Sequence, residues 1–280
     1  MNKHFSQNTD MLRHQRLETI NIDYRHFVSI LREELPKIDD SLQHKRRGST
    51  DGWLSCALTW SHELARMTHL QYELPFGDTL PYIKKGRDVA IEYFYGNWRE
   101  SYQKFPASIY TRDDCRKELR WDEEFQHGIL CALWIGDEKN LAKLASWVDD
   151  DLVDYGIYDC SEVDAWFLVL LAKFLKGESL QTNSHIVEII RKKNRRRPKL
   201  LLDVLESIEN VPIRFGEVLA KYVKYYVKSE FNPEETSPLD CVSKMASVLW
   251  ATAKRVDVVM PLLQEEIMDR IMTSESIGLT

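Results

Sequence analysis

The residues best suited to chemistry in this sequence are the carboxylates of Asp150-Asp151-Leu152-Val153-Asp154, which match the pattern D-D-x-x-D. In a helical protein, carboxylates four residues apart share a helix face, and their hard oxygen atoms suit Mg²⁺. Such a site can hold the metal for a diphosphate substrate. Class I prenyl and terpene synthases also need a second metal-binding motif on a facing helix, and the sequence contains none. We therefore expect an acidic surface here, with a magnesium-dependent enzyme as an alternative.

This motif belongs to a wider group of acidic residues, which is the strongest candidate for a binding surface. Between residues 113 and 164 the chain carries 15 Asp or Glu against 5 Lys or Arg, whereas the whole chain has a net charge of −6. Like charges this close repel each other, and a basic partner would relieve the repulsion and be attracted quickly. We predict that a partner binds Asp149, Asp150, Asp151, Asp154, Asp159, Glu162 and Asp164.

Two other interpretations of these acids remain open. The segment could be a solvated loop between two helices, and Glu162 and Asp164 could simply favour a helix N-terminus, where the helix dipole attracts negative charge.

A basic run is the second unusual charge feature. Arg191 to Lys199 holds seven basic residues in nine positions, a pattern that can contact nucleic acid. The whole chain is negative and no nucleic-acid motif surrounds the run, so we expect no direct nucleic-acid binding. The alternatives are an exposed connection after a helix C-terminus, or ion pairs with the protein's own acidic segment or with an adjacent subunit.

The remaining motifs argue against an enzyme. The sequence contains no G-x-S-x-G, no P-loop and no G-x-G-x-x-G, and His62-Glu63-Leu64-Ala65-Arg66 does not complete H-E-x-x-H. The five Cys lack C-x-x-C spacing, which is typical of reduced thiols packed as small apolar groups in a cytosolic protein. We expect no catalytic residue, no metal and no cofactor.

The composition fits a cytoplasmic protein with a substantial core. Hydrophobic residues make up 44% of the chain and charged residues 29%. No apolar run approaches the roughly 20 residues of a membrane-spanning helix, and the N-terminus has no run of signal-peptide type. We therefore expect no membrane association.

The elements that position these residues are expected to be helices. Gly and Pro together make up only 20 of 280 residues, and apolar residues recur with helical spacing. The clearest stripe is Trp121, Phe125, Ile129, Ala132 and Leu133. It ends at Gly136, which suits the left-handed position after a helix, and Asp137 can cap the returning helix. A connection this short predicts an antiparallel hairpin.

The hairpin pattern continues toward the C-terminus. Gly136 and Gly177 close helices 41 residues apart, which indicates a repeat of roughly 40 residues. Pro238 is expected to open a later helix, and a last short helix should run to Met272. We predict an all-α fold in which antiparallel helical hairpins pack as a bundle or short repeat-like array. Residues 1–111 form an N-terminal helical sub-bundle in this interpretation, and residues 112–280 the hairpin region.

Parts of the hairpin region resemble a known family. The similar stretches are Ile129 to Leu144, Ser161 to Trp166, Phe215 to Leu219, Ser247 to Ala251 and Pro261 to Leu263. They are similar to an all-helical immunity family of bacterial polymorphic toxin systems, catalogued as immunity protein forty-nine. The resemblance covers roughly residues 120–270 and consists of helix patterns rather than an invariant motif.

The resemblance implies a non-enzymatic protein that binds and neutralises a cognate toxin made by the same cell, often a nuclease in such systems. No binding residue can be carried over from the family. A nuclease is basic where it holds phosphate, and the acidic segment could occupy such a surface. A generic helical scaffold or regulator remains the alternative, and the oligomeric state is open.

Overall fold

The computed structural model describes residues 50–70, 79–96, 121–154, 161–231 and 238–279, together with Glu33. Within these residues the chain is all-α and forms no strand, which confirms the expected fold class. The α-helices are α2 (Thr50–Leu70), α3 (Leu80–Tyr95), α6 (Trp121–Trp134), α7 (Glu138–Trp147), α8 (Glu162–Leu175), α9 (Ser184–Lys192), α10 (Arg196–Asn210), α11 (Phe215–Ser229), α12 (Lys244–Arg255) and α13 (Glu265–Met268). Four short 3₁₀ helices accompany them: η2 (Asp150–Asp154), η3 (Pro212–Arg214), η4 (Pro238–Cys241) and η5 (Glu275–Ile277).

The turn between α6 and α7 forms as its sequence predicts. Gly136 adopts a φ of +65°, the left-handed conformation that a glycine reaches without steric cost. Asp137 follows as the N-cap of α7, and its side chain accepts a hydrogen bond of 3.1 Å from the backbone N–H of Asn140. α6 and α7 therefore pack as an antiparallel hairpin.

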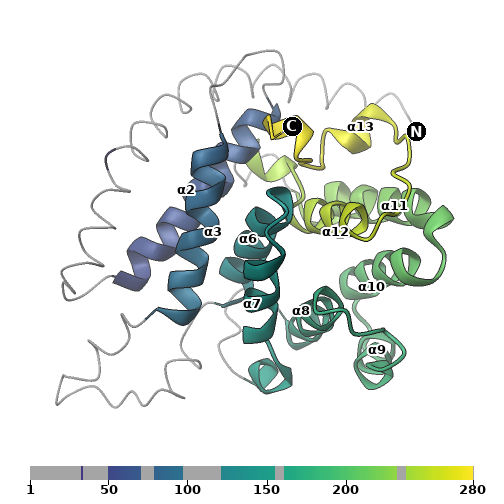
Figure 1. The fold of residues 1–280 in the computed structure, drawn as a ribbon. Coiled ribbons are helices and arrows are strands. Elements are labelled where there is room, and N and C mark those ends of the chain that lie inside the picture. The colour runs from purple at the N-terminus through teal and green to yellow at the C-terminus, as the bar shows by residue number, and fades with distance from the viewer. Residues whose placement is uncertain are drawn as a thin grey trace.

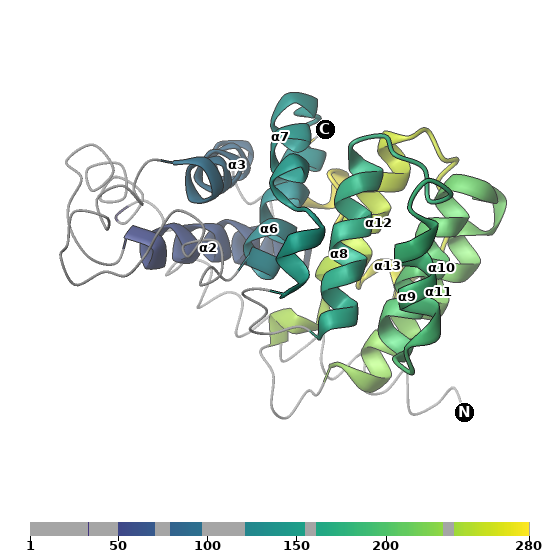
Figure 2. The ribbon, with the colours of Figure 1, turned by 90° about the horizontal axis from the view of Figure 1, so that it is seen from below.

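From α8 to α12 the chain forms a row of helices (Figures 1 and 2). The starts of α8, α10 and α12 meet at Asp164, Arg197 and Lys244, and their ends meet at Phe174, Glu209 and Arg255, so these three helices run in the same direction. α10 lies at the centre of this row, where it contacts α8, α9, α11 and α12. The predicted array of helical hairpins is thus present in the described residues.

α2 and α3 pack on the other side of α6 and share its core (Figure 1). Trp121 and Phe125 of α6 are fully buried there. A Cβ on Gly128 would lie 2.7 Å from the Cβ of Ala90, so a glycine permits the close approach of α3 and α6. Most of the expected sub-bundle 1–111, including its boundary at residues 111 and 112, lies outside the described residues.

Two helix boundaries differ from the sequence prediction. Pro238 opens the short helix η4, and α12 begins only at Lys244, because Ser243 caps it by accepting a hydrogen bond of 3.2 Å from Ala246 N–H. The last helix, α13, ends at Met268 instead of Met272. In both places local capping and turn geometry end the helical pattern that apolar spacing suggests.

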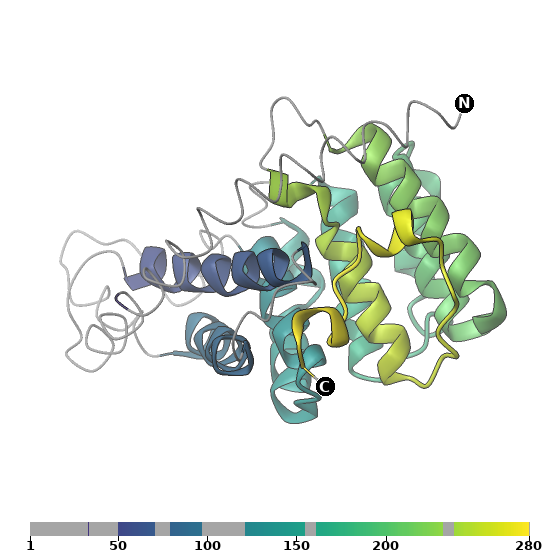
Figure 3. The ribbon, with the colours of Figure 1, turned by 90° about the horizontal axis from the view of Figure 1, so that it is seen from above.

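The C-terminal segment returns across α12 toward α2 (Figure 3). His69 Nδ1 of α2 lies 2.8 Å from Ser276 Oγ, and Thr79 donates a hydrogen bond to the carbonyl of Ile277. Both ends of the described chain are thereby tied into one core. None of the described helices combines the length and the apolar character needed to cross a bilayer.

Candidate functional site

The D-D-x-x-D segment forms the 3₁₀ helix η2 and not an α-helix. A 3₁₀ helix has three residues per turn, so residues four apart do not share a face as they would in an α-helix. Asp150 Oδ1 lies 3.0 Å from Lys173 Nζ, and Asp150 Oδ2 lies 3.6 Å from His185 Nε2. In the part of the chain that the structure describes, no three His, Cys, Asp or Glu side chains are grouped as metal ligands.

The other predicted acids have different surroundings. Asp149 is half-buried beside η2, and Asp151 is exposed. The side chain of Asp154 and the whole of Asp159 lie outside the described residues. Glu162 is exposed at the start of α8, 3.5 Å from Lys193 Nζ.

The side chain of Asp164 forms hydrogen bonds with other residues of the protein. Ser161 and Asp164 form a capping box, in which Asp164 N–H donates to Ser161 Oγ at 3.4 Å and Ser161 N–H donates to Asp164 Oδ2 at 3.3 Å. Ser161 Oγ also donates a hydrogen bond of 2.6 Å to Asp164 Oδ2. Asp164 Oδ1 accepts a second hydrogen bond of 2.9 Å from Arg197. The sequence interpretation that Asp164 favours a helix N-terminus is therefore confirmed.

The predicted acids thus fall into two groups on α8. Asp150 pairs with Lys173 in the last turn of the helix, whereas Glu162 and Asp164 stand in its first turn. Eleven residues of α-helix separate Glu162 from Lys173, a rise of roughly 16 Å. The structure brings Asp149, Asp150 and Asp151 together and places Glu162 and Asp164 apart from them.

Four residues of the basic run form ion pairs within the protein: Arg191, Lys192, Lys193 and Arg197. α9 ends at Lys192 and α10 begins at Arg196, so the run covers the end of one helix and the first turn of the next. Arg191 pairs with Asp203 at 2.6 Å and with Glu206 at 2.5 Å. Lys193 and Arg197 pair with Glu162 and Asp164. Pairing with the protein's own acidic segment, one of the alternatives drawn from the sequence, therefore occurs.

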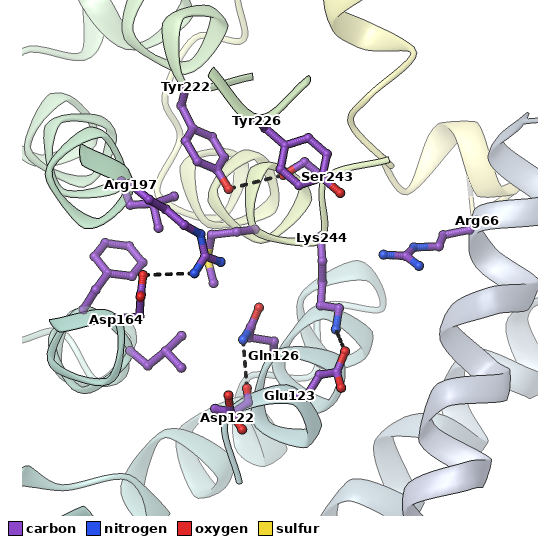
Figure 4. Close-up of a pocket in the computed structure, with 14 residues that line it drawn as sticks. Arg66, Asp122, Glu123, Gln126, Asp164, Arg197, Tyr222, Tyr226, Ser243 and Lys244 are labelled. Carbon is purple, nitrogen blue, oxygen red and sulfur yellow. Dashed lines mark hydrogen bonds and ion pairs between the residues drawn. The ribbon is translucent and has the colours of Figure 1, made fainter. Parts of the chain in front are cut away.

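A polar cavity of about 300 Å³ lies where α2, α6, α8, α10, α11 and α12 meet (Figure 4). This volume is at the lower end of the range for small-molecule sites. Its charged lining residues are Arg66, Asp122, Glu123, Asp164, Arg197 and Lys244. Of the predicted binding residues, only Asp164 lines this cavity.

Arg66 and Lys244 are the cations on one side of the cavity. Arg66 Nη1 lies 2.9 Å from both Glu63 Oε1 and Asp240 Oδ1, while its Nε atom has no hydrogen-bond partner within the described residues. Burial by itself lowers the pKa of Arg66, but the carboxylates of Glu63 and Asp240 raise it overall. Lys244 Nζ lies 2.7 Å from Glu123 Oε1, and burial lowers its pKa.

Two tyrosines close the cavity on the α11 side. Burial raises the pKa of Tyr222 to about 12, and Ser243 Oγ donates a hydrogen bond of 3.4 Å to its hydroxyl. The hydroxyl of Tyr226 donates to the carbonyl of Asp240. At neutral pH both tyrosines are therefore protonated, and the lining can bind and orient a polar group.

A buried polar cluster lies between α2 and α6. The ring centroids of His62 and His127 are 4.4 Å apart, and burial lowers the pKa of both rings well below the ordinary value, so both are neutral at pH 7. Burial raises the pKa of Glu124 to about 7, although Ser55 Oγ donates a hydrogen bond of 2.6 Å to it. These groups make the junction of the two helices sensitive to pH.

Sequence reasoning missed these residues because they come from distant segments. Arg66 and Asp240, for example, are 174 residues apart in the chain. A weak signal was present, since Arg66 stands between Leu64 and Met67 of an apolar stripe. A charged residue at such a position is either solvated or paired, and only the fold decides which.

No family model matches the chain, and neither a curated protein nor a solved structure matches it. The fold itself therefore defines the class of protein: all-α, built from antiparallel helical hairpins around one core.

Proposed function

We propose that this protein is a non-enzymatic binding protein of the immunity type, which neutralises a cognate toxin made by the same cell. The resemblance over roughly residues 120–270 supports the proposal, and that range spans α6 to α13. The observation that carries the binding mode is the acidic group at η2, in which Asp151 is exposed and Asp149 and Asp150 are half-buried.

The ion pairs of these acids leave them available to a partner. Asp150 is 41% exposed in its pair with Lys173, and Glu162 is 56% exposed in its pair with Lys193. The exposed pair of Glu162 contributes between 0 and about 1 kcal/mol, so a cation of a partner can replace Lys193 there. Lys173 is only 19% exposed, so at Asp150 a partner would meet the exposed part of the carboxylate while the pair with Lys173 stays in place. Asp164 differs because it is only 15% exposed and holds both the start of α8 and Arg197, so we assign it a structural role.

The partner that suits this surface is a basic protein, with a nuclease as one candidate class. Its positive charge would be attracted to η2, and the association rate would fall as salt screens that attraction. Asp154 and Asp159 stay in the proposal on sequence grounds alone. Direct binding of nucleic acid or membrane is not part of it, and the cytoplasm is the proposed location.

The test is a titration with the protein encoded by the neighbouring gene. We expect the variant Asp150→Lys/Asp151→Lys to bind it about ten-fold more weakly or worse, because two attractive charges become repulsive. The matched control is Glu188→Lys/Glu217→Lys, which makes the same charge change at two exposed positions on α9 and α11. The control variant should bind like the wild type.

If the two variants bind with equal affinity, η2 is not the partner-binding surface. Absence of any binding by the wild type would favour the scaffold or regulator, above all if the neighbouring genes are regulatory. A Mg²⁺ ion bound at Asp150 and Asp151 in the presence of a diphosphate analogue would favour the enzyme instead.

A further inference from the structure

A groove opens at one end of the helical row. The C-terminal ends of α8, α10 and α12 meet the start of α7 around a space of about 370 Å³. Its charged lining residues are Glu138, Glu178, Glu209 and Arg255. Phe174 and Val256 supply apolar walls.

The groove has a negative electrostatic character. Of the three carboxylates in the lining, Glu138 pairs with Arg255 at 2.8 Å and Glu178 pairs with Lys176 at 3.3 Å. Glu209 accepts a hydrogen bond of 2.9 Å from the backbone N–H of Leu180 and keeps its charge. The carbonyl ends of α8, α10 and α12 add the negative pole of each helix dipole. A positively charged group is therefore the complementary occupant.

An apolar rim continues from the groove along the same end of the row. Its exposed members are Val211, Ile213, Val256, Val259 and Leu262, and Ile213, Val259 and Leu262 are 88% exposed or more. The two segments that carry them touch, since a Cβ on Gly216 would lie 2.7 Å from Pro261 Cβ. A gathering of exposed aliphatic side chains beside a groove is typical of a protein-binding surface.

The acids of η2 lie near the same end of α8 as this groove. Asp150 pairs with Lys173, and the next residue in the chain, Phe174, lines the groove. The apolar rim meets the groove at Val256, which belongs to both. Glu162 and Asp164 stand at the opposite end of that helix, outside this region.

We infer that a partner protein docks on this end of the row through a segment that carries apolar side chains flanked by Lys or Arg. Its cations face Glu178, Glu209 and the η2 acids, while its apolar side chains cover Val256, Val259 and Leu262. The inference rests on the proposed function and extends the interface from η2 across the groove. It places apolar contacts beside charged ones, and specific interfaces contain both kinds.

The test uses the variant Val259→Lys/Leu262→Lys, which removes apolar contact and adds repulsive charge at two nearly fully exposed positions. Thr59→Lys, at an exposed site on α2, is the control. Two probes are titrated: the protein encoded by the neighbouring gene, and a short synthetic helix-forming peptide of leucine and lysine. We expect the double variant to bind both probes about ten-fold more weakly or worse, and the control to bind like the wild type. Circular dichroism and the melting temperature verify that both variants fold.

The outcomes separate the two proposals. One outcome is that Val259→Lys/Leu262→Lys binds both probes with unchanged affinity while Asp150→Lys/Asp151→Lys binds the toxin more weakly. This outcome overturns the inferred docking on the groove and rim and keeps the proposed function. Absence of wild-type binding to either probe overturns both. Sedimentation that shows a wild-type dimer split by Leu262→Lys makes a second copy of this chain the occupant and overturns the inference of a basic partner.

Discussion

Arg197 Nη1 donates a hydrogen bond of 2.9 Å to Asp164 Oδ1 and thereby joins the first turn of α10 to the first turn of α8 (Figure 4). Arg197 Nε also lies 3.3 Å from Glu230 Oε2. One member of the basic run and one member of the acidic segment thus neutralise each other inside the molecule. The acidic segment and the basic run each suggested an external partner, but Asp164 and Arg197 instead contact each other.

This contact predicts a difference between two acids that are two residues apart. Asp164→Ala removes the capping box and leaves Arg197 short of one partner, so the free energy of unfolding should fall by about 2–4 kcal/mol. Glu162→Ala removes only an exposed pair and should cost less than about 1 kcal/mol. Urea unfolding measures both values. Similar costs for the two variants would contradict the structural role given to Asp164.

Glu124 should make stability fall as pH rises. Burial raises its pKa from 4.5 in the unfolded chain to about 7 in the folded protein, so the folded state holds the proton more tightly. The stability gained from this proton is present below pH 4.5 and is lost as pH rises through about 7. Glu124→Gln stays neutral and keeps an acceptor for Ser55. Its stability relative to the wild type should therefore increase between pH 5 and pH 8, by on the order of 3 kcal/mol.

Urea unfolding of both proteins across this pH range measures the difference, with Glu162→Gln as the exposed control. A difference that does not change with pH would show that Glu124 is charged in the folded protein already at low pH.

The paired histidines should act in the opposite direction. Burial lowers the pKa of His62 well below 6.5, so the unfolded chain takes up a proton that the folded protein does not bind. Stability is therefore lost as pH falls below 6.5, by up to about 1.4 kcal/mol per pH unit. His62→Phe retains a ring beside His127 and should lose less stability than the wild type between pH 6.5 and pH 5.

Thermal unfolding at several pH values measures this effect. The reciprocal variant His127→Phe should behave in the same way, since burial also lowers the pKa of that ring. Equal acid sensitivity of wild type and both variants would contradict the assignment.

Gly216 should tolerate no side chain. A Cβ there would lie 2.7 Å from Pro261 Cβ and 2.8 Å from Pro261 Cγ, so Gly216→Ala must displace the segment that carries Val259 and Leu262. The overpacking cost of about 1–3 kcal/mol should equal or exceed the gain of about 1 kcal/mol in helix propensity, and the melting temperature should fall. In a Pro261→Gly background the same change should destabilise much less, because the two closest atoms are gone and only Leu263 Cδ2, at 3.3 Å, remains in contact. Destabilisation of equal size in that background would point to another cause.

The helix ends show how much of the fold follows from local sequence. Gly136, Asp137 and Gly177 end or begin helices as predicted, because left-handed φ angles and capping hydrogen bonds involve only neighbouring residues. The prediction was wrong at Pro238, where the cap at Ser243 delays α12. Either site could start a helix by local rules, and the packing of the segment selects one of them.

The charged residues show what the sequence alone could not decide. It revealed an excess of acids between residues 113 and 164 and a basic run near residue 195, because composition is a property of the chain. It could not show that Asp164 faces Arg197 or that Arg66 meets Asp240, since these pairs depend on contacts between distant segments. Only the tertiary structure assigned some of these charges to internal pairs and left others, such as Asp151, on the surface. The physical reason is that a charge near water remains available, whereas a charge buried by folding must find its partner inside the protein.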